Sequence, residues 1–250
     1  MLEEVDIKER MEEFGIIYRN HRKRLAQIIS QEDSIEKLLR IIPEAFHASA
    51  KFLDSYVLCD LVLKNEAKKI LEVGSFMGFS TSLLLRASLP HQGEVLSIDP
   101  GLATLGENIS IPAIFEQMTK EFQNRLRIKR AYFAVTPEKR SPIDTITAPF
   151  DEEFDFIFID GNHTVINVIE DFHLASKMLR PNGLIAFHDV CMLEVKSAIK
   201  WLAYKYSKRF DFKIHKAPLD YLYSPKLIAE FTPLDHASSS IGVFYDRKKK

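Results

Sequence analysis

The segment that most constrains this chain is Lys69-Ile-Leu-Glu-Val-Gly-Ser-Phe-Met-Gly-Phe-Ser-Thr81. An apolar run leads into Gly74, and a helix-like pattern begins after Gly78. A second apolar run, residues 95–98, ends at Asp99. A strand, a glycine turn, a helix and a strand that ends in a carboxylate form the arrangement that holds a nucleoside by its ribose hydroxyls. The sequence therefore indicates a nucleoside-containing cofactor before it indicates any substrate.

The spacing of the two glycines narrows the kind of ligand. Gly74 and Gly78 are spaced as Gly-x-x-x-Gly, whereas a dinucleotide pyrophosphate is usually held by Gly-x-Gly-x-x-Gly. A ligand with one nucleoside and no phosphates fits this turn better. Asp99 is expected to accept hydrogen bonds from both ribose hydroxyls; the alternative is a carboxylate that caps the strand end or a turn. Glu72 lies inside the first strand and needs partners there, so it either braces the glycine loop or faces a cationic group of the ligand.

The pattern after Lys68 alternates between strand and helix. Apolar runs predict strands at 69–73, 94–98, 126–130, 154–159, 183–188, 210–215 and 241–245. Amphipathic spacing predicts helices at 79–88, 113–123, 165–179 and 192–207, with Arg180-Pro-Asn-Gly183 stopping the third helix. This order predicts an α/β, Rossmann-like, doubly wound sheet of seven mostly parallel strands with helices on both faces. Ligands of such sheets bind at the carboxyl ends of the strands.

Residues 1–65 contain no convincing strand and are predicted to form a helical extension, followed by a main domain over 66–250. Apolar residues recur at helical spacing from Leu25 to Ile42, and Pro43 begins a new segment. The extension is expected to be a helical layer packed on the main domain. The alternative for part of residues 1–45 is a lid or a dimer arm.

Charge and composition bear on partners and location. With 34 basic and 35 acidic residues the net charge is −1, so no strong field attracts nucleic acid or an anionic membrane. The acidic N-terminus lacks the apolar core of a signal peptide, and no apolar run approaches the about 20 residues needed to span a bilayer. These features predict a cytoplasmic protein without nucleic-acid or membrane partners. Cys59 and Cys191 both lie in apolar sequence, which predicts two reduced core thiols.

Four ordered motifs resemble those of class I S-adenosylmethionine-dependent methyltransferases. Residues 72–80 resemble motif I of the small-molecule O-methyltransferases similar to catechol and caffeoyl-CoA O-methyltransferases, and Ile98-Asp99-Pro100 resembles their ribose-binding acid. Residues 154–163 and 183–189 resemble their fourth and fifth strands. The sequences Ile-Asp-Gly-x-His and Phe-His-Asp are similar to those of sugar and macrolide O-methyltransferases. The resemblance covers roughly residues 68–190.

The resemblance implies roles for individual residues in binding the cofactor. The backbone around Gly74 and Phe76 would line the methionine part, Ser80 would bind its carboxylate, and Asp160 would bind its amine, a metal, or both. Tyr132 is expected either to stack on adenine or to be part of the core. The expected cofactor-binding residues are Glu72, Gly74, Phe76, Gly78, Ser80, Asp99, Tyr132 and Asp160.

Two carboxylates and a histidine are expected at the catalytic end. Asp160 and Asp189 follow neighbouring strands, and such a pair suits Mg²⁺ or another divalent cation; the alternative is a salt-bridged or capping pair. Catechol-type enzymes have an Asn ligand after the last Asp, where this chain has Val190. His188 is expected to be structural, because successive strand residues point to opposite faces. His163 lies three residues after Asp160, where related enzymes carry a Lys or His general base, and is the expected general base; the alternative is a solvated histidine in a loop.

The resemblance implies an S-adenosylmethionine-dependent O-methyltransferase with a small hydroxylated acceptor. The alternatives are a nucleoside-cofactor enzyme of the same fold that transfers no methyl group and a binding module without catalysis. The insert at 217–240 is expected to form part of the acceptor wall or a contact in a homodimer, because loops of this length are often functional.

Overall fold

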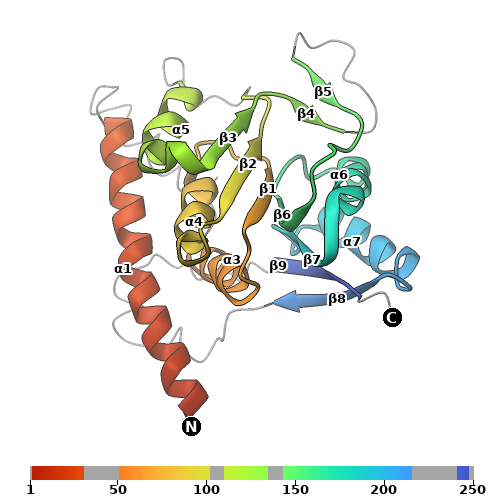
Figure 1. Ribbon diagram of the computed structural model, residues 1–250, viewed down its shortest axis with the longest axis horizontal. Coiled ribbons are helices and arrows are strands. Elements are labelled where there is room, and N and C mark those ends of the chain that lie inside the picture. Colours follow the sequence, from red (N-terminus) through yellow and green to blue (C-terminus); the bar gives the residue numbers. More distant parts are fainter. Residues whose placement is uncertain (1, 31–50, 102–109, 135–142, 216–240, 248–250) are drawn as a thin grey trace.

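The computed structural model describes residues 2–30, 51–101, 110–134, 143–215 and 241–247, and its main feature is a seven-stranded sheet (Figure 1). The strand order is β3-β2-β1-β6-β7-β9-β8. These strands are β1 (Lys69–Val73), β2 (Glu94–Ile98), β3 (Leu126–Lys129), β6 (Phe154–Ile159), β7 (Leu179–Phe187), β8 (Phe210–His215) and β9 (Ile241–Asp246). The predicted doubly wound architecture is confirmed. Two short strands, β4 (Tyr132–Phe133) and β5 (Thr145–Ile146), pair separately.

Strand direction fixes where ligands can bind. The pairs β1–β2, β2–β3, β1–β6 and β6–β7 are parallel, and β9 is antiparallel to both β7 and β8. The chain proceeds from β1 outward to β2 and β3 and then returns to β6 on the other side of β1. Strand order therefore reverses between β1 and β6, which is where open α/β sheets bind their ligands.

Helices cover both faces of the sheet (Figure 1). Ile70 and Phe156 belong to one core, which includes side chains of the helices on that face, whereas Leu71 and Ile157 belong to the other core. This alternation follows from the two-residue period of a strand. The helices of the first face are α1 (Leu2–Ser30), α3 (Phe52–Lys64), α4 (Phe79–Ala87) and α5 (Ile111–Thr119), and those of the second are α6 (Val165–Met178) and α7 (Leu193–Lys205).

The N-terminal helices belong to the same core as the sheet. In α1 the side chains of Phe14, Tyr18 and Leu25 are buried, and His21 Nε2 lies 2.5 Å from Ser82 Oγ of α4. This supports the predicted helical layer. The lid or dimer-arm alternative for residues 31–45 lies outside the described residues, and the domain boundary at 65 stays a prediction. No helix that the structure describes combines the length and the apolar character needed to cross a membrane.

Some element ends differ from the sequence prediction. Arg180-Pro-Asn-Gly183 does not stop a helix but lies within β7, where Asn182 has a left-handed φ of 66° and the pairing with β6 is irregular. Helix α5 begins two residues earlier than predicted, because Ser110 caps it and Pro112 fits its first turn. After Thr119 it continues as a short 3₁₀ helix, η2 (Lys120–Arg125). Of the two predicted core thiols, Cys59 is buried, but Cys191 is exposed because it lies beyond the end of β7.

Candidate active site

The loop between β1 and α4 depends on its glycines. Gly74 has φ 84° and Gly78 has φ 78°, values that favour glycine. A Cβ at position 74 would lie 2.2 Å from the backbone oxygen of Asp160. Gly74 therefore allows a close backbone approach to the loop that follows β6. The glycine turn and the Asp160 loop are packed together as one unit.

Glu72 is fully buried beneath this loop. Its two carboxylate oxygens accept hydrogen bonds from Ser80 Oγ (2.7 Å) and Thr81 Oγ1 (2.5 Å) in the first turn of α4. Burial raises the pKa of Glu72 to about 7, although the hydrogen bonds from Thr81 and Ser80 oppose this shift. Of the two roles open for Glu72, bracing the glycine loop matches these contacts. The Ser80 hydroxyl is used in this brace, and its predicted contact with a cofactor carboxylate stays a prediction.

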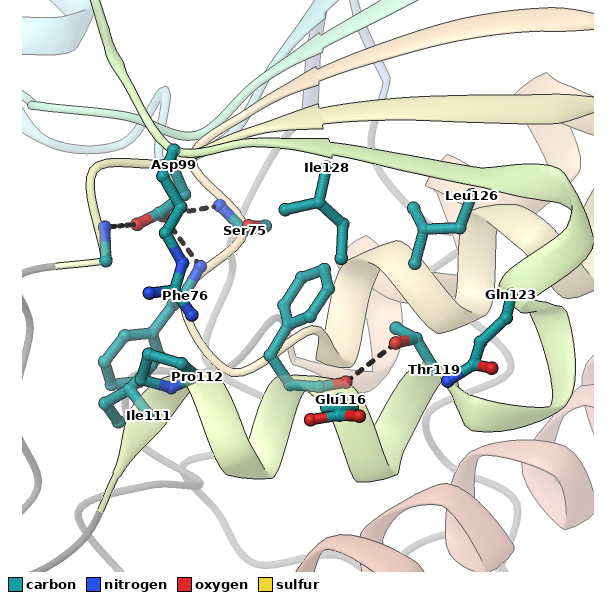
Figure 2. A pocket seen from close by; sticks show the side chains of 13 residues that line it. Ser75, Phe76, Asp99, Ile111, Pro112, Glu116, Thr119, Gln123, Leu126 and Ile128 are labelled. Atoms are coloured by element: carbon teal, nitrogen blue, oxygen red, sulfur yellow. Dashed lines mark hydrogen bonds between the residues drawn. The ribbon is translucent and has the colours of Figure 1, made fainter. Parts of the chain in front are cut away.

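Asp99 connects the end of β2 to the glycine loop (Figure 2). Its Oδ2 accepts hydrogen bonds from the backbone N–H groups of Ser75 and Phe76, each at 2.9 Å. Its Oδ1 accepts a hydrogen bond from the Gly101 N–H at 2.6 Å. The carboxylate thus fixes the backbone on both sides of itself, which matches the alternative that Asp99 caps a turn. It also lines a cavity.

A cavity of about 550 Å³ opens beside Asp99, between α5 and β3 (Figure 2). Sequence reasoning missed the α5 wall, because the packing of α5 against the edge strand is a tertiary property with no local motif. Tyr132, the predicted adenine contact, is half-buried in β4 and is not among the lining residues. The lining residues are Ser75, Phe76, Asp99, Gly101, Ile111, Pro112, Phe115, Glu116, Thr119, Gln123, Leu126, Ile128 and Arg130.

The structure brings Asp160, His163 and Asp189 together, as predicted. Asp160 immediately follows β6, and Asp189 lies two residues beyond the end of β7. His163 Nε2 is 3.5 Å from Asp160 Oδ1 and 3.5 Å from Asp189 Oδ2. The three side chains are half-buried, so the cluster can still be approached from outside.

His188 is a fourth member of this cluster, which corrects the expectation that it points away from Asp189. Its Nδ1 lies 3.1 Å from Asp160 Oδ1 and 3.4 Å from Asp189 Oδ2. The alternation rule fails here because β7 ends at Phe187 and Asp189 has a left-handed φ of 51°. The other ring nitrogen, Nε2, lies 3.2 Å from Asp54 Oδ2 in α3. No sequence signal singled out Asp54, which is one of two acids in the mainly apolar helix α3.

Charges in the cluster support one another. Burial lowers the pKa of His188, but the nearby Asp160 and its hydrogen bonds to carboxylates outweigh burial and raise it well above the usual value. Burial raises the pKa of Asp160, yet His188 and His163 together hold it well below its ordinary range. The close contact with Asp160 Oδ1, at 3.5 Å, raises the pKa of His163. The site thus combines ionised carboxylates with basic imidazoles.

The donor set of this cluster fits a divalent cation. One ligand atom from each of Asp160, His163 and Asp189 lies within 4.8 Å of the others. His163 Nε2 is buried and has no hydrogen-bond partner within the described part of the chain. The carboxylate oxygens suit Mg²⁺ or Mn²⁺, whereas an imidazole nitrogen is a ligand that Fe²⁺ or Zn²⁺ prefers. The predicted pair of metal ligands therefore gains His163 as a third candidate.

Residues 71–190 match the family model described as a methyltransferase domain. This match agrees with the methyltransferase class predicted from the motifs. An O-methyltransferase from Bacillus cereus in complex with SAH has a similar fold, with a TM-score of 0.53 and 16% identity over 96% of this chain and 91% of that chain. The O-methyltransferase TomG from Streptomyces achromogenes, involved in tomaymycin synthesis and in complex with SAM, has a TM-score of 0.54 and 14% identity over 86% and 91%. No curated protein matches the chain by sequence.

Proposed function

We propose that this chain is an S-adenosylmethionine-dependent O-methyltransferase that acts on a small hydroxylated molecule. The observation that carries the proposal is the pairing of two features at the carboxyl edge of the sheet, one on each side of β1. Asp99 holds the glycine loop beside an open cavity, and His163 lies between Asp160 and Asp189 on the other side of that loop. The similar folds from Bacillus cereus and Streptomyces achromogenes are O-methyltransferases with SAH and SAM, respectively.

The cofactor would lie across the carboxyl ends of β1, β2 and β6. Asp99, at the mouth of the cavity, is the acceptor for ribose hydroxyls. Ile111, Pro112 and Phe115 give the cavity an apolar wall suited to adenine. Asp160 would bind the methionine amine, and the close contact of Gly74 with its backbone keeps it beside the glycine loop.

The chemistry assigned to this chain is proton removal and positioning. The cofactor supplies a methyl group on a sulfonium, and the acceptor hydroxyl oxygen displaces the thioether in line. His163 takes the hydroxyl proton as the oxygen–carbon bond forms and the carbon–sulfur bond breaks. Asp160 and Asp189 stabilise the resulting imidazolium, because both carboxylates lie 3.5 Å from Nε2. The raised pKa of His163 has the same origin.

A divalent cation is the other way to activate the hydroxyl. Asp160 and Asp189 would hold it, with His163 Nε2 as a third ligand, and the cation would lower the pKa of an acceptor hydroxyl. His163 could not then use the same nitrogen as a base. Turnover that EDTA abolishes and Mg²⁺ or Mn²⁺ restores assigns the cation. Full activity in EDTA leaves the base mechanism alone.

The proposed function is tested first by cofactor choice and then by methyl transfer. Calorimetry should show that S-adenosylhomocysteine binds more tightly than NADH; the reverse order rejects the cofactor class. Methyl-labelled S-adenosylmethionine is then incubated with a panel of phenols, sugars and macrolides. Label in a product supports the O-methyltransferase, whereas binding without any transfer favours the other nucleoside enzymes or a binding module. A homodimer and a cytoplasmic location stay predictions.

A further inference from the structure

Asp54 is a buried carboxylate that the proposed chemistry does not use. It lies in the first turn of α3, within the N-terminal extension, and its side chain is only 2% exposed. Its neighbours in the helix are mainly apolar and buried, so the charge needs a partner. That partner is His188, which is distant in sequence and follows β7.

The ring of His188 is held on both sides. Nε2 lies 3.2 Å from Asp54 Oδ2, and Nδ1 lies 3.1 Å from Asp160 Oδ1. Carboxylate oxygens accept hydrogen bonds and do not donate them, so each ring nitrogen donates toward its own carboxylate. The ring also makes an edge contact with Phe158, with the centroids 6.2 Å apart. Asp54, His188 and Asp160 therefore form a continuous buried connection from α3 to the end of β6.

This connection leaves Asp160 little freedom. One of its oxygens, Oδ1, is engaged by His188, so the orientation of the carboxylate depends on the position of that ring. Without Asp54, the His188 ring would lose the hydrogen bond at Nε2, on the side away from Asp160. It could then rotate away from Asp160 or leave a buried N–H without an acceptor.

We propose that Asp54 is a positioning residue that acts through His188 to fix the Asp160 carboxylate, so that the N-terminal extension completes the cofactor site. The inference rests on the proposed function, because it takes Asp160 as a cofactor contact. It adds a residue from outside 71–190, the segment that matches the methyltransferase model. Groups that hold a binding residue in place typically contribute about 10–100-fold to affinity or activity.

The experiment measures the affinity of the full-length protein for S-adenosylhomocysteine by calorimetry. Asp54→Ala should weaken binding by about tenfold. Asp54→Asn keeps an acceptor oxygen at the same place and should restore most of the affinity. In an Asp160→Ala background, Asp54→Ala should have no further effect beyond about twofold, because contacting residues couple. Additive effects in the two backgrounds, or an Asp54→Ala affinity equal to that of the wild type, would overturn the proposal.

A matched control separates positioning from general stability. Ser82→Ala removes another buried polar contact between the extension and the main domain, the one with His21. It should lower the melting temperature and leave the affinity for S-adenosylhomocysteine unchanged. If Asp54→Ala fails to fold, Asp54→Val is used in its place. If neither variant folds, Asp54 is needed for folding and the positioning role is rejected. A wild-type protein that does not bind S-adenosylhomocysteine would reject the proposed function itself, which is a separate outcome.

Discussion

At the scale of single residues, Asp99 shows how one carboxylate can serve a loop and a ligand. Its two oxygens accept three backbone N–H groups, from Ser75, Phe76 and Gly101. Because these bonds exist before any ligand is bound, the loop needs little ordering when the cofactor arrives. Preorganisation of this kind increases affinity by lowering the entropic cost of binding.

Replacement of Asp99 tests this double role. Asp99→Ala removes the expected ribose acceptor and the anchor of the glycine loop, so binding of S-adenosylhomocysteine should weaken by at least about 1–3 kcal/mol. Calorimetry measures the change. Asp211→Ala is the control. Asp211 lies on β8, away from the cavity, and is an exposed carboxylate paired with Arg247. Unchanged affinity in Asp99→Ala would contradict the assignment of Asp99 to the cofactor.

His163 is the residue whose replacement should affect turnover most. His163→Ala should lower the turnover number by about 10²–10⁴-fold, the usual contribution of a positioned base. A base must be neutral to accept a proton, and contact with Asp160 raises the pKa of His163. Wild-type turnover should therefore increase as the pH rises through that raised value. Rates of methyl transfer from pH 5 to 10 measure both effects.

The control for His163 is a histidine remote from the cluster. His91→Ala changes a histidine in the short turn Leu89–His91, which lies before β2, and should keep both the rate and its pH profile. For an acceptor whose hydroxyl ionises by itself, the deficit of His163→Ala should shrink at high pH. A deficit that stays constant at every pH would assign His163 to positioning or to metal binding instead.

The sequence predicted the strand-end acids better than their surroundings. Asp99, Asp160 and Asp189 follow apolar strands, and the carboxyl ends of parallel strands share an edge, so their convergence could be foreseen. The places of His188 and Asp54 could not. The direction of His188 depends on the backbone turn that gives Asp189 a positive φ, and Asp54 reaches the site only through the packing of α3.

At the scale of elements, a side chain at Gly74 in the glycine loop is opposed both by the positive φ and by contact with a neighbouring loop. Gly74→Ala would place a Cβ 2.2 Å from the Asp160 backbone oxygen, whereas Gly101, with φ 68°, has no atom within 4 Å of such a Cβ. Gly101→Ala should therefore cost only the conformational penalty, about 1–2 kcal/mol. Gly74→Ala should cost about 1–3 kcal/mol more through overpacking. Urea unfolding of both variants measures the difference, and equal losses would reject the close contact.

Element ends were predictable where a single signal decides them. The predicted bounds of β1, β2, β6 and β8 agree with the structure, because each is an apolar or alternating run between clear turn signals. The start of β7 was missed, since Arg180-Pro-Asn-Gly183 has the composition of a turn, whereas in the structure it forms an irregularity within β7 between Leu179 and Leu184, both of which pair with β6. Propensity is a weaker determinant than pairing with a neighbouring strand.

At the scale of the whole molecule, the N-terminal helix α1 is joined to α4, one of the helices that cover the sheet, by a buried polar contact. Ser82 Oγ donates to the Phe79 carbonyl, so His21 Nε2 must donate to Ser82. Burial, together with Arg86 and Arg24, lowers the pKa of His21 from 6.5 to about 4. Protonation of this one ring therefore opposes the docking of α1.

The pH dependence of stability should reveal this docking contact. A histidine with a depressed pKa contributes stability above pH 6.5 that is lost as the pH falls through about 4. The full effect is on the order of 3 kcal/mol. Glu72, with its pKa raised to about 7, acts in the opposite direction as the pH rises from 4.5. The measurement is therefore the difference in unfolding free energy between the wild type and His21→Phe from pH 4 to 7. A difference that does not change with pH would contradict a buried neutral His21.

The place of β9 has a consequence for how the molecule folds. β9 lies between β7 and β8, although both of those strands precede it in the chain. The sheet therefore cannot be completed in the order in which its strands occur in the chain. Until β9 inserts, β7 and β8 each present an unpaired edge, and such edges attract other chains. The rate of this insertion, more than the strength of the finished sheet, then decides how much of a newly made or refolding population escapes aggregation.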